Sequence, residues 1–131
     1  MSRLPVLLAL AGSALLLGAA APASDAPKPA RSACFLSTDW QGWKPSADSR
    51  TIYIHVNVRD YYRLDLSSAC TRLQDPTAHL VTHSQSPWIC NAIDLDLKVA
   101  DENGFAIPCI VRKITPMTRA EVDALPKKQR P

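Results

Sequence analysis

Four widely spaced cysteines that follow an export signal constrain this chain more than any other feature. The first 23 residues are typical of a secretory signal peptide: Arg3 supplies positive charge, an apolar run follows, and Ala21 and Ala23 fit an A-x-A cleavage site. We expect cleavage after Ala23, with cleavage after Ala21 as the less favoured alternative. The cysteines lie downstream and would reach an oxidising compartment, where disulfides persist. The sequence therefore predicts a periplasmic or secreted protein.

The chain has the size of one small domain once the signal is removed. About 108 residues would remain, and their division is predicted as a flexible leader (24–32), a β-rich disulfide domain (33–126) and a mobile basic tail (127–131). The apolar run is short for a membrane span, which needs roughly 20 residues, so no transmembrane segment is expected after cleavage; an uncleaved anchor is the alternative. The 15 Lys and Arg nearly balance 12 Asp and Glu, which disfavours a nucleic-acid partner.

Alternating apolar and polar residues predict a first β-hairpin. Thr51–Val58 and Tyr62–Leu66 each have an apolar residue at every second position, with Arg59–Tyr61 between them as a three-residue loop. One register puts both apolar rows on the same face, and it places His55 opposite Asp65 on the other face. The remaining expected pairs are Val58 with Tyr62, Val56 with Leu64, Ile54 with Leu66 and Asn57 with Arg63.

The rest of the domain predicts further strands. One is expected over 78–83, and a second hairpin would join 93–99 to 105–114, with Val99 opposite Phe105, Leu97 opposite Ile107 and Leu95 opposite Cys109. Pro108 lacks a backbone donor, so the last strand needs an edge or a bulge at that point. The segment 37–45 is turn-prone and carries two tryptophans.

The C-terminal part predicts one short helix. Thr118 and Glu121 have capping-box spacing, Met117 is placed to pack on Val122, and Pro126 ends the helix. The expected fold class is therefore mainly β: a small disulfide-linked curled sheet or barrel of five to six strands with a short C-terminal helix.

Four cysteines allow three disulfide pairings. If Leu95 opposes Cys109, then Cys90 lies about 17 Å away along its strand, whereas a disulfide needs Cα atoms within about 7 Å. This disfavours Cys90–Cys109. We favour Cys70–Cys90, which would hold the strand 78–83 between its neighbours, and Cys34–Cys109, which would tie the start of the domain to its last strand. Four free thiols at a metal site are the alternative, but no C-x-x-C pair is present. No metal or cofactor is expected.

The ordered cysteines and their neighbours resemble a known family. The matching elements are Cys34-Phe35, Trp43, the strand 52–58, Tyr62-x-Leu64-x-Leu66, Cys70-x-x-Leu73, Ile89-Cys90 with Asp94, and Pro108-Cys109-Ile110 followed by Ile114-Thr115-Pro116. Together they resemble an exported bacterial family known only as a domain of unknown function. Members of such families are often lipoproteins, and this chain departs from that pattern because it lacks a lipidatable cysteine. The resemblance implies a β-rich, disulfide-linked envelope protein and no particular activity.

The strongest acid–base candidate is the expected pair of His55 and Asp65, with Arg63 and Tyr53 on the same face. A carboxylate beside an imidazole can orient it and favour its charged form. An ordinary solvated cross-strand pair explains the same pattern and is favoured. The sequence also lacks a G-x-S-x-G nucleophile motif.

Two groups of possible metal ligands are explained better by ordinary positions in strands and turns than by metal binding. His79 and His83 would converge on a metal only in a helix, and in the expected strand they lie roughly 13 Å apart. Asp94 and Asp96, with Asp101 or Glu102, offer oxygens for a cation. Alternating polar residues on a solvated strand face, followed by an ordinary turn, account for these carboxylates equally well.

Aromatic residues give the best binding candidates: Trp40, Trp43 and Tyr53, with Trp88 as a further ring. Tryptophan combines a large apolar surface with a hydrogen-bond donor, which suits recognition, although core packing also explains Trp43. We expect an exported, non-enzymatic binding or structural module of the bacterial cell envelope, with an unknown envelope protein or glycan as partner. The alternative is a small secreted hydrolase or enzyme inhibitor that uses His55, Asp65 and Arg63.

Overall fold

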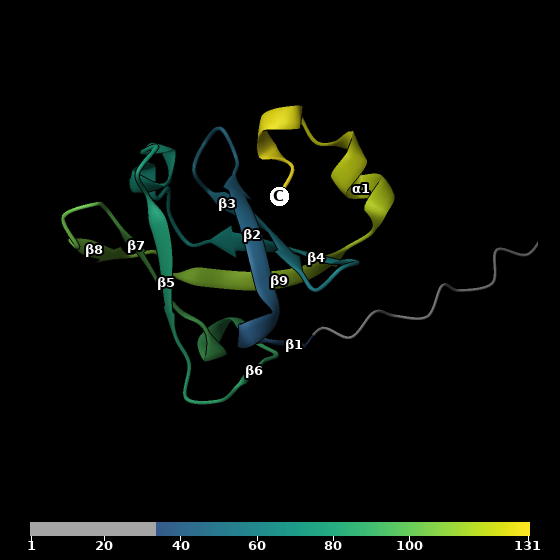
Figure 1. Ribbon diagram of the computed structural model, residues 1–131, viewed down its shortest axis with the longest axis horizontal. Coiled ribbons are helices and arrows are strands. Elements are labelled where there is room, and N and C mark those ends of the chain that lie inside the picture. The colour runs from purple at the N-terminus through teal and green to yellow at the C-terminus, as the bar shows by residue number, and fades with distance from the viewer. Residues whose placement is uncertain (1–33) are drawn as a thin grey trace, which may run out of the picture.

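The computed structural model describes residues 34–131, so the predicted signal peptide and leader lie outside the described residues. Within this range the chain forms nine β-strands, one α-helix and four 3-10 helices (Figure 1). The strands form three antiparallel sheets of four, three and two strands. The mainly β prediction with a short C-terminal helix is confirmed, but nine strands in three sheets are present where five to six strands in one curled sheet or barrel were expected. No helix in the described range is long and apolar enough to cross a membrane.

The largest sheet holds the predicted first hairpin. Its strands are β2 (Trp40–Pro45), β3 (Thr51–Val56), β4 (Asp60–Leu66) and β9 (Val111–Met117), in the order β2-β3-β4-β9. Alternate residues of β3 and β4 are buried and form the centre of the core, as the period-2 pattern predicts: Ile52, Ile54, Val56, Tyr62, Leu64 and Leu66.

The predicted register of this hairpin is wrong. The strand ends at Val56, so the loop is residues 57–59, and Ile54 pairs with Tyr62 instead of Leu66. Asn57 adopts a positive φ of 57°, a conformation that asparagine tolerates in tight turns. The correction moves the pairing by an even number of residues, which keeps every side chain on its expected face. Alternation therefore fits both registers. As a consequence, His55 lies opposite Tyr61, and Asp65 lies opposite Thr51.

The second sheet has three strands, β5 (His79–His83), β7 (Asp96–Ala100) and β8 (Ala106–Pro108), in the order β5-β7-β8. The strand predicted over 78–83 is confirmed as β5. The strand predicted over 93–99 begins later, because residues 92–94 form the 3-10 helix η3 (Ala92–Asp94), where Ile93 is 92% exposed. Val99 pairs with Ile107 instead of Phe105, a shift of two residues from the expected register.

The segment 105–114, predicted as one strand, is divided between two sheets. It forms β8 up to Pro108 and then crosses to the four-stranded sheet as β9, which pairs with β4. Pro108 ends an edge strand, as its missing N–H requires. This crossing explains why Ile110 and Ile114 fall out of phase with the residues before Pro108.

The third sheet pairs two short strands, β1 (Phe35–Leu36) and β6 (Trp88–Ile89). The turn predicted over 37–45 is wrong beyond its first residues: the 3-10 helix η1 (Ser37–Asp39) leads directly into β2. The sequence of this segment does not show the usual alternation of apolar and polar residues, because it contains Gly42 and because a bulge lies between Trp40 and Gly42.

The preferred disulfide pairing is also wrong: the bonds are Cys34–Cys90 and Cys70–Cys109. Pairing of β1 with β6 brings Cys34 beside Cys90. The crossing after Pro108 brings Cys109 toward Cys70, because the Ser67 N–H donates to the Ile110 carbonyl at 2.9 Å.

The connection from β4 to β5 ties the two large sheets together. It contains the 3-10 helix η2 (Thr71–Gln74), which begins beside the Cys70–Cys109 bond. Arg72 forms an ion pair with Asp101 at 2.9 Å, in the turn between β7 and β8. Gln74 Nε2 donates to the Ser46 carbonyl at 2.9 Å and to Ser49 Oγ at 3.0 Å, in the turn between β2 and β3.

The C-terminal segment covers the second face of the four-stranded sheet. The helix α1 (Arg119–Ala124) has the predicted capping box between Thr118 and Glu121, and Val122 packs with Met117 and Tyr61. The basic tail predicted over 127–131 has local structure. Residues 127–129 form the 3-10 helix η4 (Lys127–Gln129), and Arg130 donates to the carbonyls of Leu125 and Asp123 at 2.9 and 2.6 Å. These bonds satisfy carbonyls left open at the end of α1.

Candidate functional site

The acid–base pair predicted from the sequence does not form. The ring of His55 stacks on the ring of Tyr61, with centroids 4.6 Å apart and planes 11° from parallel. Asp65 instead forms an ion pair with Arg63, whose Nε lies 3.1 Å from Asp65 Oδ1. The corrected register is the physical reason, since it moves Asp65 away from His55 along β4.

The face that carries His55 is a packing surface for the C-terminal segment. Arg119 donates to the Tyr61 hydroxyl at 2.9 Å, and its guanidinium lies 5.7 Å from the centre of the Tyr61 ring. His55 Nε2 and Thr115 Oγ1 are buried here without a hydrogen-bond partner among the described residues. Tyr53 is half-buried on the same face, and burial raises the pKa of its phenol. Packing explains these residues without a substrate.

The candidate cation ligands are also separated. Asp94 Oδ2 accepts the backbone N–H groups of Cys90 and Asn91 at 3.0 and 2.8 Å, and these bonds lower its pKa. Asp101 accepts backbone N–H groups in its own turn and pairs with Arg72. Asp96 lies 3.7 Å from Lys98 Nζ. No cluster of three or more possible metal ligands is found within residues 34–131.

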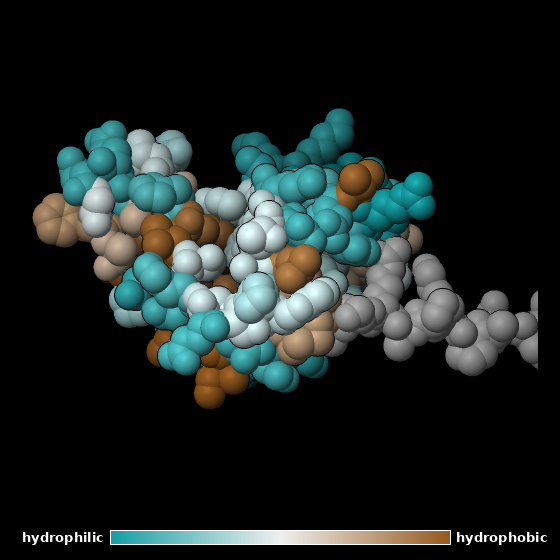
Figure 2. Space-filling view, turned by 60° about the horizontal axis from the view of Figure 1, so that its bottom comes forward, coloured by the Kyte–Doolittle hydropathy of each residue, from teal (hydrophilic) through white to brown (hydrophobic). Residues whose placement is uncertain are grey.

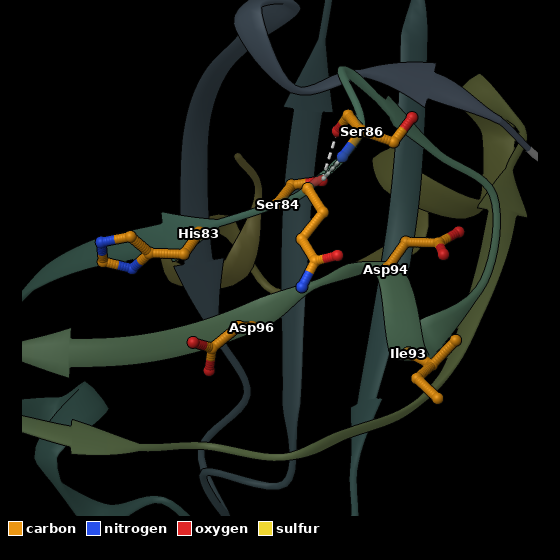
Figure 3. Close-up of a pocket in the computed structure, with 7 residues that line it drawn as sticks. His83, Ser84, Ser86, Ile93, Asp94 and Asp96 are labelled. Carbon is orange, nitrogen blue, oxygen red and sulfur yellow. Dashed lines mark hydrogen bonds between the residues drawn. The ribbon is translucent and has the colours of Figure 1, made fainter.

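A polar hollow of about 330 Å³ lies where β5 ends and η3 begins. Figure 3 shows His83, Asp94 and Asp96 spread around this hollow without converging on one point. Asp94 is already engaged in holding the turn before η3. The hollow therefore combines separate surface groups and offers no assembled acid–base or metal site.

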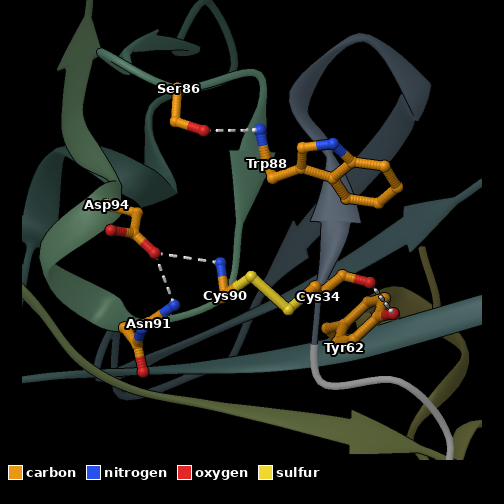
Figure 4. The surroundings of a disulfide bond; sticks show 7 residues. All are labelled: Cys34, Tyr62, Ser86, Trp88, Cys90, Asn91 and Asp94. Atoms are coloured by element: carbon orange, nitrogen blue, oxygen red, sulfur yellow. Dashed lines mark hydrogen bonds between the residues drawn. A yellow bond between two sulfur atoms is a disulfide. The ribbon is translucent and has the colours of Figure 1, made fainter.

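Trp88 stands apart from the other two tryptophans. It is 52% exposed on β6, near the Cys34–Cys90 bond (Figure 4). The Tyr62 hydroxyl donates to the Cys34 carbonyl at 3.4 Å beside this bond. Cys34 and Cys90 are half-buried, whereas Cys70 and Cys109 are buried in the core.

The remaining two tryptophans share a groove between two strand edges. Trp40 and Trp43, both on β2, are half-buried against the core and line a hollow of about 320 Å³. The opposite wall comes from β5, with His79, Leu80 and Thr82. Figure 1 shows β2 and β5 side by side at this place. We call this hollow the β2–β5 groove.

The β2–β5 groove extends beyond this first hollow. A second hollow of about 400 Å³ shares Trp43 and continues toward η2, and its lining includes the charged residues Lys44, Asp75 and Lys128. The first hollow has no Asp, Glu, Lys or Arg in its lining, and its polar groups are hydroxyl, amide and imidazole groups. This chemistry suits binding of an uncharged surface.

The other hydrophobic surface lies at several places, one of which is a second apolar hollow. Figure 2 shows one face of the molecule, on which hydrophobic patches are separated by hydrophilic and intermediate surface. Of the exposed large apolar residues, Ile93 and Ile110 line one hollow of about 460 Å³ together with Leu95, Leu97 and Pro108. The others are Val58, Trp88, Phe105 and Ile107. Isolated residues of this kind are common on protein surfaces and do not by themselves mark a site.

The sequence prediction found Trp40 and Trp43 but missed the β5 side of the groove. Tyr53, the third predicted binding residue, faces away from them, because it pairs with Lys44 while Trp43 pairs with Ile54. Leu80 and Thr82 carry no local signal, since their role depends on the position of β5 relative to β2.

Comparison with known proteins adds the family but no activity. Neither the curated proteins nor the solved structures contain a match to the chain. One family, described as a family of unknown function (DUF6491), matches residues 2–131, which is nearly the whole sequence. The match agrees with the resemblance carried by the ordered cysteines. The chain therefore belongs to this family of unknown function, DUF6491.

Proposed function

We propose that this protein is an exported, non-enzymatic binding module of the bacterial cell envelope, and that the β2–β5 groove is its recognition site. The observation that carries the proposal is the pair of half-buried tryptophans in the first hollow of the groove, whose lining has no Asp, Glu, Lys or Arg. Tryptophan is enriched where proteins recognise partners, because it offers apolar area together with a donor. The partner is another envelope component, a protein or a glycan.

Two further observations support this proposal. The two disulfides are what an exported small domain uses to stabilise a limited core. The groups considered for catalysis are each engaged in separate interactions: His55 with Tyr61, and Asp65 with Arg63. A hydrolase or inhibitor that uses His55, Asp65 and Arg63 remains the alternative, and this geometry does not favour it.

The test is capture of a partner from envelope extract by the immobilised protein. Wild type and the Trp88→Ala variant should capture the same component, because Trp88 lies outside the β2–β5 groove. Trp40→Ala should reduce capture by roughly tenfold or more, the effect of losing a central aromatic contact. Near-ultraviolet circular dichroism would verify that each variant keeps the wild-type fold.

Two results would count against the proposal. Equal capture by wild type and Trp40→Ala would show that the groove is not the recognition site. The His55→Ala variant should retain full capture, since His55 is packed against Tyr61 on the opposite face. Loss of capture in that variant alone would favour the alternative based on His55.

A further inference from the structure

The hydrogen-bond pattern shows which backbone groups of β2 face the groove. In an antiparallel pair, residues alternate between those bonded to the neighbour and those directed away from it. The Ser46 N–H donates to the Thr51 carbonyl at 2.8 Å, and the register pairs Lys44 with Tyr53 and Trp43 with Ile54. Lys44 is therefore bonded to β3. The N–H and C=O of Trp43 point away from β3, toward the groove.

The same reasoning applies to β5. The Cys109 N–H donates to the Leu97 carbonyl at 2.9 Å, so Leu97 and Val99 of β7 are directed toward β8. Asp96, Lys98 and Ala100 are then directed toward β5, where they pair with His83, Val81 and His79. This leaves the N–H and C=O of Leu80 and Thr82 directed into the groove.

These two edges face each other without pairing. No backbone hydrogen bond joins β2 to β5 in the part of the chain that the structure describes. Trp43 on one wall and Leu80 and Thr82 on the other are all lining residues of the same hollow. The groove thus has outward-directed backbone donors and acceptors on both of its walls.

Prolines distinguish β5 from the other strand edges of the two large sheets. Proteins protect exposed edges with proline, which has no N–H to offer an incoming strand. Pro45 lies on β2, Pro108 on β8 and Pro116 on β9, and by the same alternation each is directed away from its neighbouring strand. β5 contains no proline and presents the N–H groups of both Leu80 and Thr82. On β2, Pro45 has no N–H to offer, so between these two positions only Trp43 presents a groove-facing N–H, and an incoming strand would pair mainly with β5.

The side chains around the groove specify what kind of segment would fit. Trp43 pairs with the buried Ile54, and Leu80 pairs with the buried Val99, so both side chains lie on the core side of their sheets. A strand between them would direct every second side chain toward this apolar surface and the others toward solvent. Five residues, the length of β5, span about 17 Å.

We propose that the β2–β5 groove binds an extended, uncharged segment of a partner polypeptide, which adds as a strand between β2 and β5. This inference rests on the proposed function and identifies its partner as a protein. The segment is about five residues long and alternates apolar with small polar side chains. Its backbone bonds to Trp43 on one side and to Leu80 and Thr82 on the other, and it joins the two large sheets into one.

Amide hydrogen exchange measured by NMR on the full secreted chain tests this inference. The probe is a pool of acetylated and amidated pentapeptides in which Val, Ile, Leu or Phe alternates with Thr, Ser or Gln. Peptides from this pool that bind the protein, added at saturating concentration, should slow exchange of the Trp43, Leu80 and Thr82 amides by roughly tenfold or more. The same peptides N-methylated at alternate residues should give no protection, because they keep the side chains but lose backbone donors.

Proline variants provide a matched pair. Thr82→Pro removes a groove-facing N–H, whereas Ala106→Pro removes an N–H from the outer edge of β8; neither N–H belongs to the β5–β7–β8 ladder. Thr82→Pro should weaken peptide binding by roughly fivefold to tenfold, the effect of one lost hydrogen bond together with strand misfit. Ala106→Pro should bind as wild type does.

Several outcomes would overturn the inference. Unchanged exchange at Trp43, Leu80 and Thr82 with all peptides would do so, as would protection that appears on β8 or β9 instead. Slow exchange of these amides before any peptide is added would also overturn it. If dilution abolished that protection, a second copy of the chain would occupy the groove; if dilution had no effect, another segment of the same chain would occupy it. Capture from envelope extract that depends on Trp40, without amide protection by peptides, would leave the proposed function standing and indicate a glycan.

Discussion

The two disulfides should differ in their contribution to stability, in an order opposite to that of their loop lengths. The chain-entropy relation for sequence separations of 56 and 39 residues gives about 4.2 kcal/mol for Cys34–Cys90 and about 3.9 kcal/mol for Cys70–Cys109. However, Cys70 and Cys109 are only 6% and 3% exposed. Replacing them by alanine also removes two buried sulfur atoms, each comparable to a methylene of about 0.8 kcal/mol. The buried bond should therefore cost more to remove, by roughly 1 kcal/mol.

The measurement is urea denaturation of the oxidised protein and of two double variants. Cys34→Ala with Cys90→Ala should lower the free energy of unfolding by about 4 kcal/mol, and Cys70→Ala with Cys109→Ala by about 5 kcal/mol. If the second variant is unfolded without urea while the first retains a cooperative transition, the order is still established. Equal losses, or a larger loss from removing Cys34–Cys90, would refute the reasoning from burial.

Further predictions concern local contacts and acid stability. Thr118→Ala removes the N-cap of α1 and should lower the free energy of unfolding by about 1 kcal/mol, measured in urea against wild type. Gln74→Ala removes two hydrogen bonds to the turn between β2 and β3 and should cost about 1–2 kcal/mol in the same assay; no change would mean that solvent replaces them. Hydrogen bonds lower the pKa values of Asp48, Asp75 and Asp94 below 3.8. These carboxylates stabilise the folded protein above pH 3.8, and this stabilisation is lost as the pH falls through the lowered pKa values. The urea midpoint should therefore fall in acid, and it should fall less steeply in an Asp94→Asn variant.

Local patterns predicted the secondary structure well where a strand has one buried face. Ile52, Ile54 and Val56 alternate with polar residues, and the resulting strand is the centre of the core. The capping box at Thr118 and the packing of Met117 on Val122 were also readable, because they depend on residues within one turn of chain.

The same local patterns could not predict which distant residues pair with each other. Two hairpin registers keep identical faces, so alternation could not choose between Tyr62 and Leu66 as the partner of Ile54. The exclusion of a Cys90–Cys109 bond was correct, but the choice between the other two pairings was wrong, because it depends on the pairing of β1 with β6 and on the crossing after Pro108. Pro108 indicated an irregularity there, but a bulge and a crossing to another sheet leave the same local sequence signal.

The candidate groove was predictable only on one side. Trp40 and Trp43 attract attention as large aromatic residues, whereas Leu80 and Thr82 belong to an ordinary short strand. Their contribution comes from backbone groups whose direction depends on the pairing of β5 with β7. Such groups have no side-chain signature in a sequence.

If the chain is exported as proposed, the crossed connectivity of its two disulfides has a consequence for its maturation. Along the sequence the order is Cys34, Cys70, Cys90, Cys109, and each bond skips one cysteine. During translocation from the N-terminus, Cys34 and Cys70 would emerge first, and rapid oxidation would join these non-partners. Correct bonding then requires either delayed oxidation or thiol–disulfide exchange after Cys90 arrives. Production in a host that lacks a disulfide isomerase should therefore yield scrambled isomers with the mass of the correctly bonded protein.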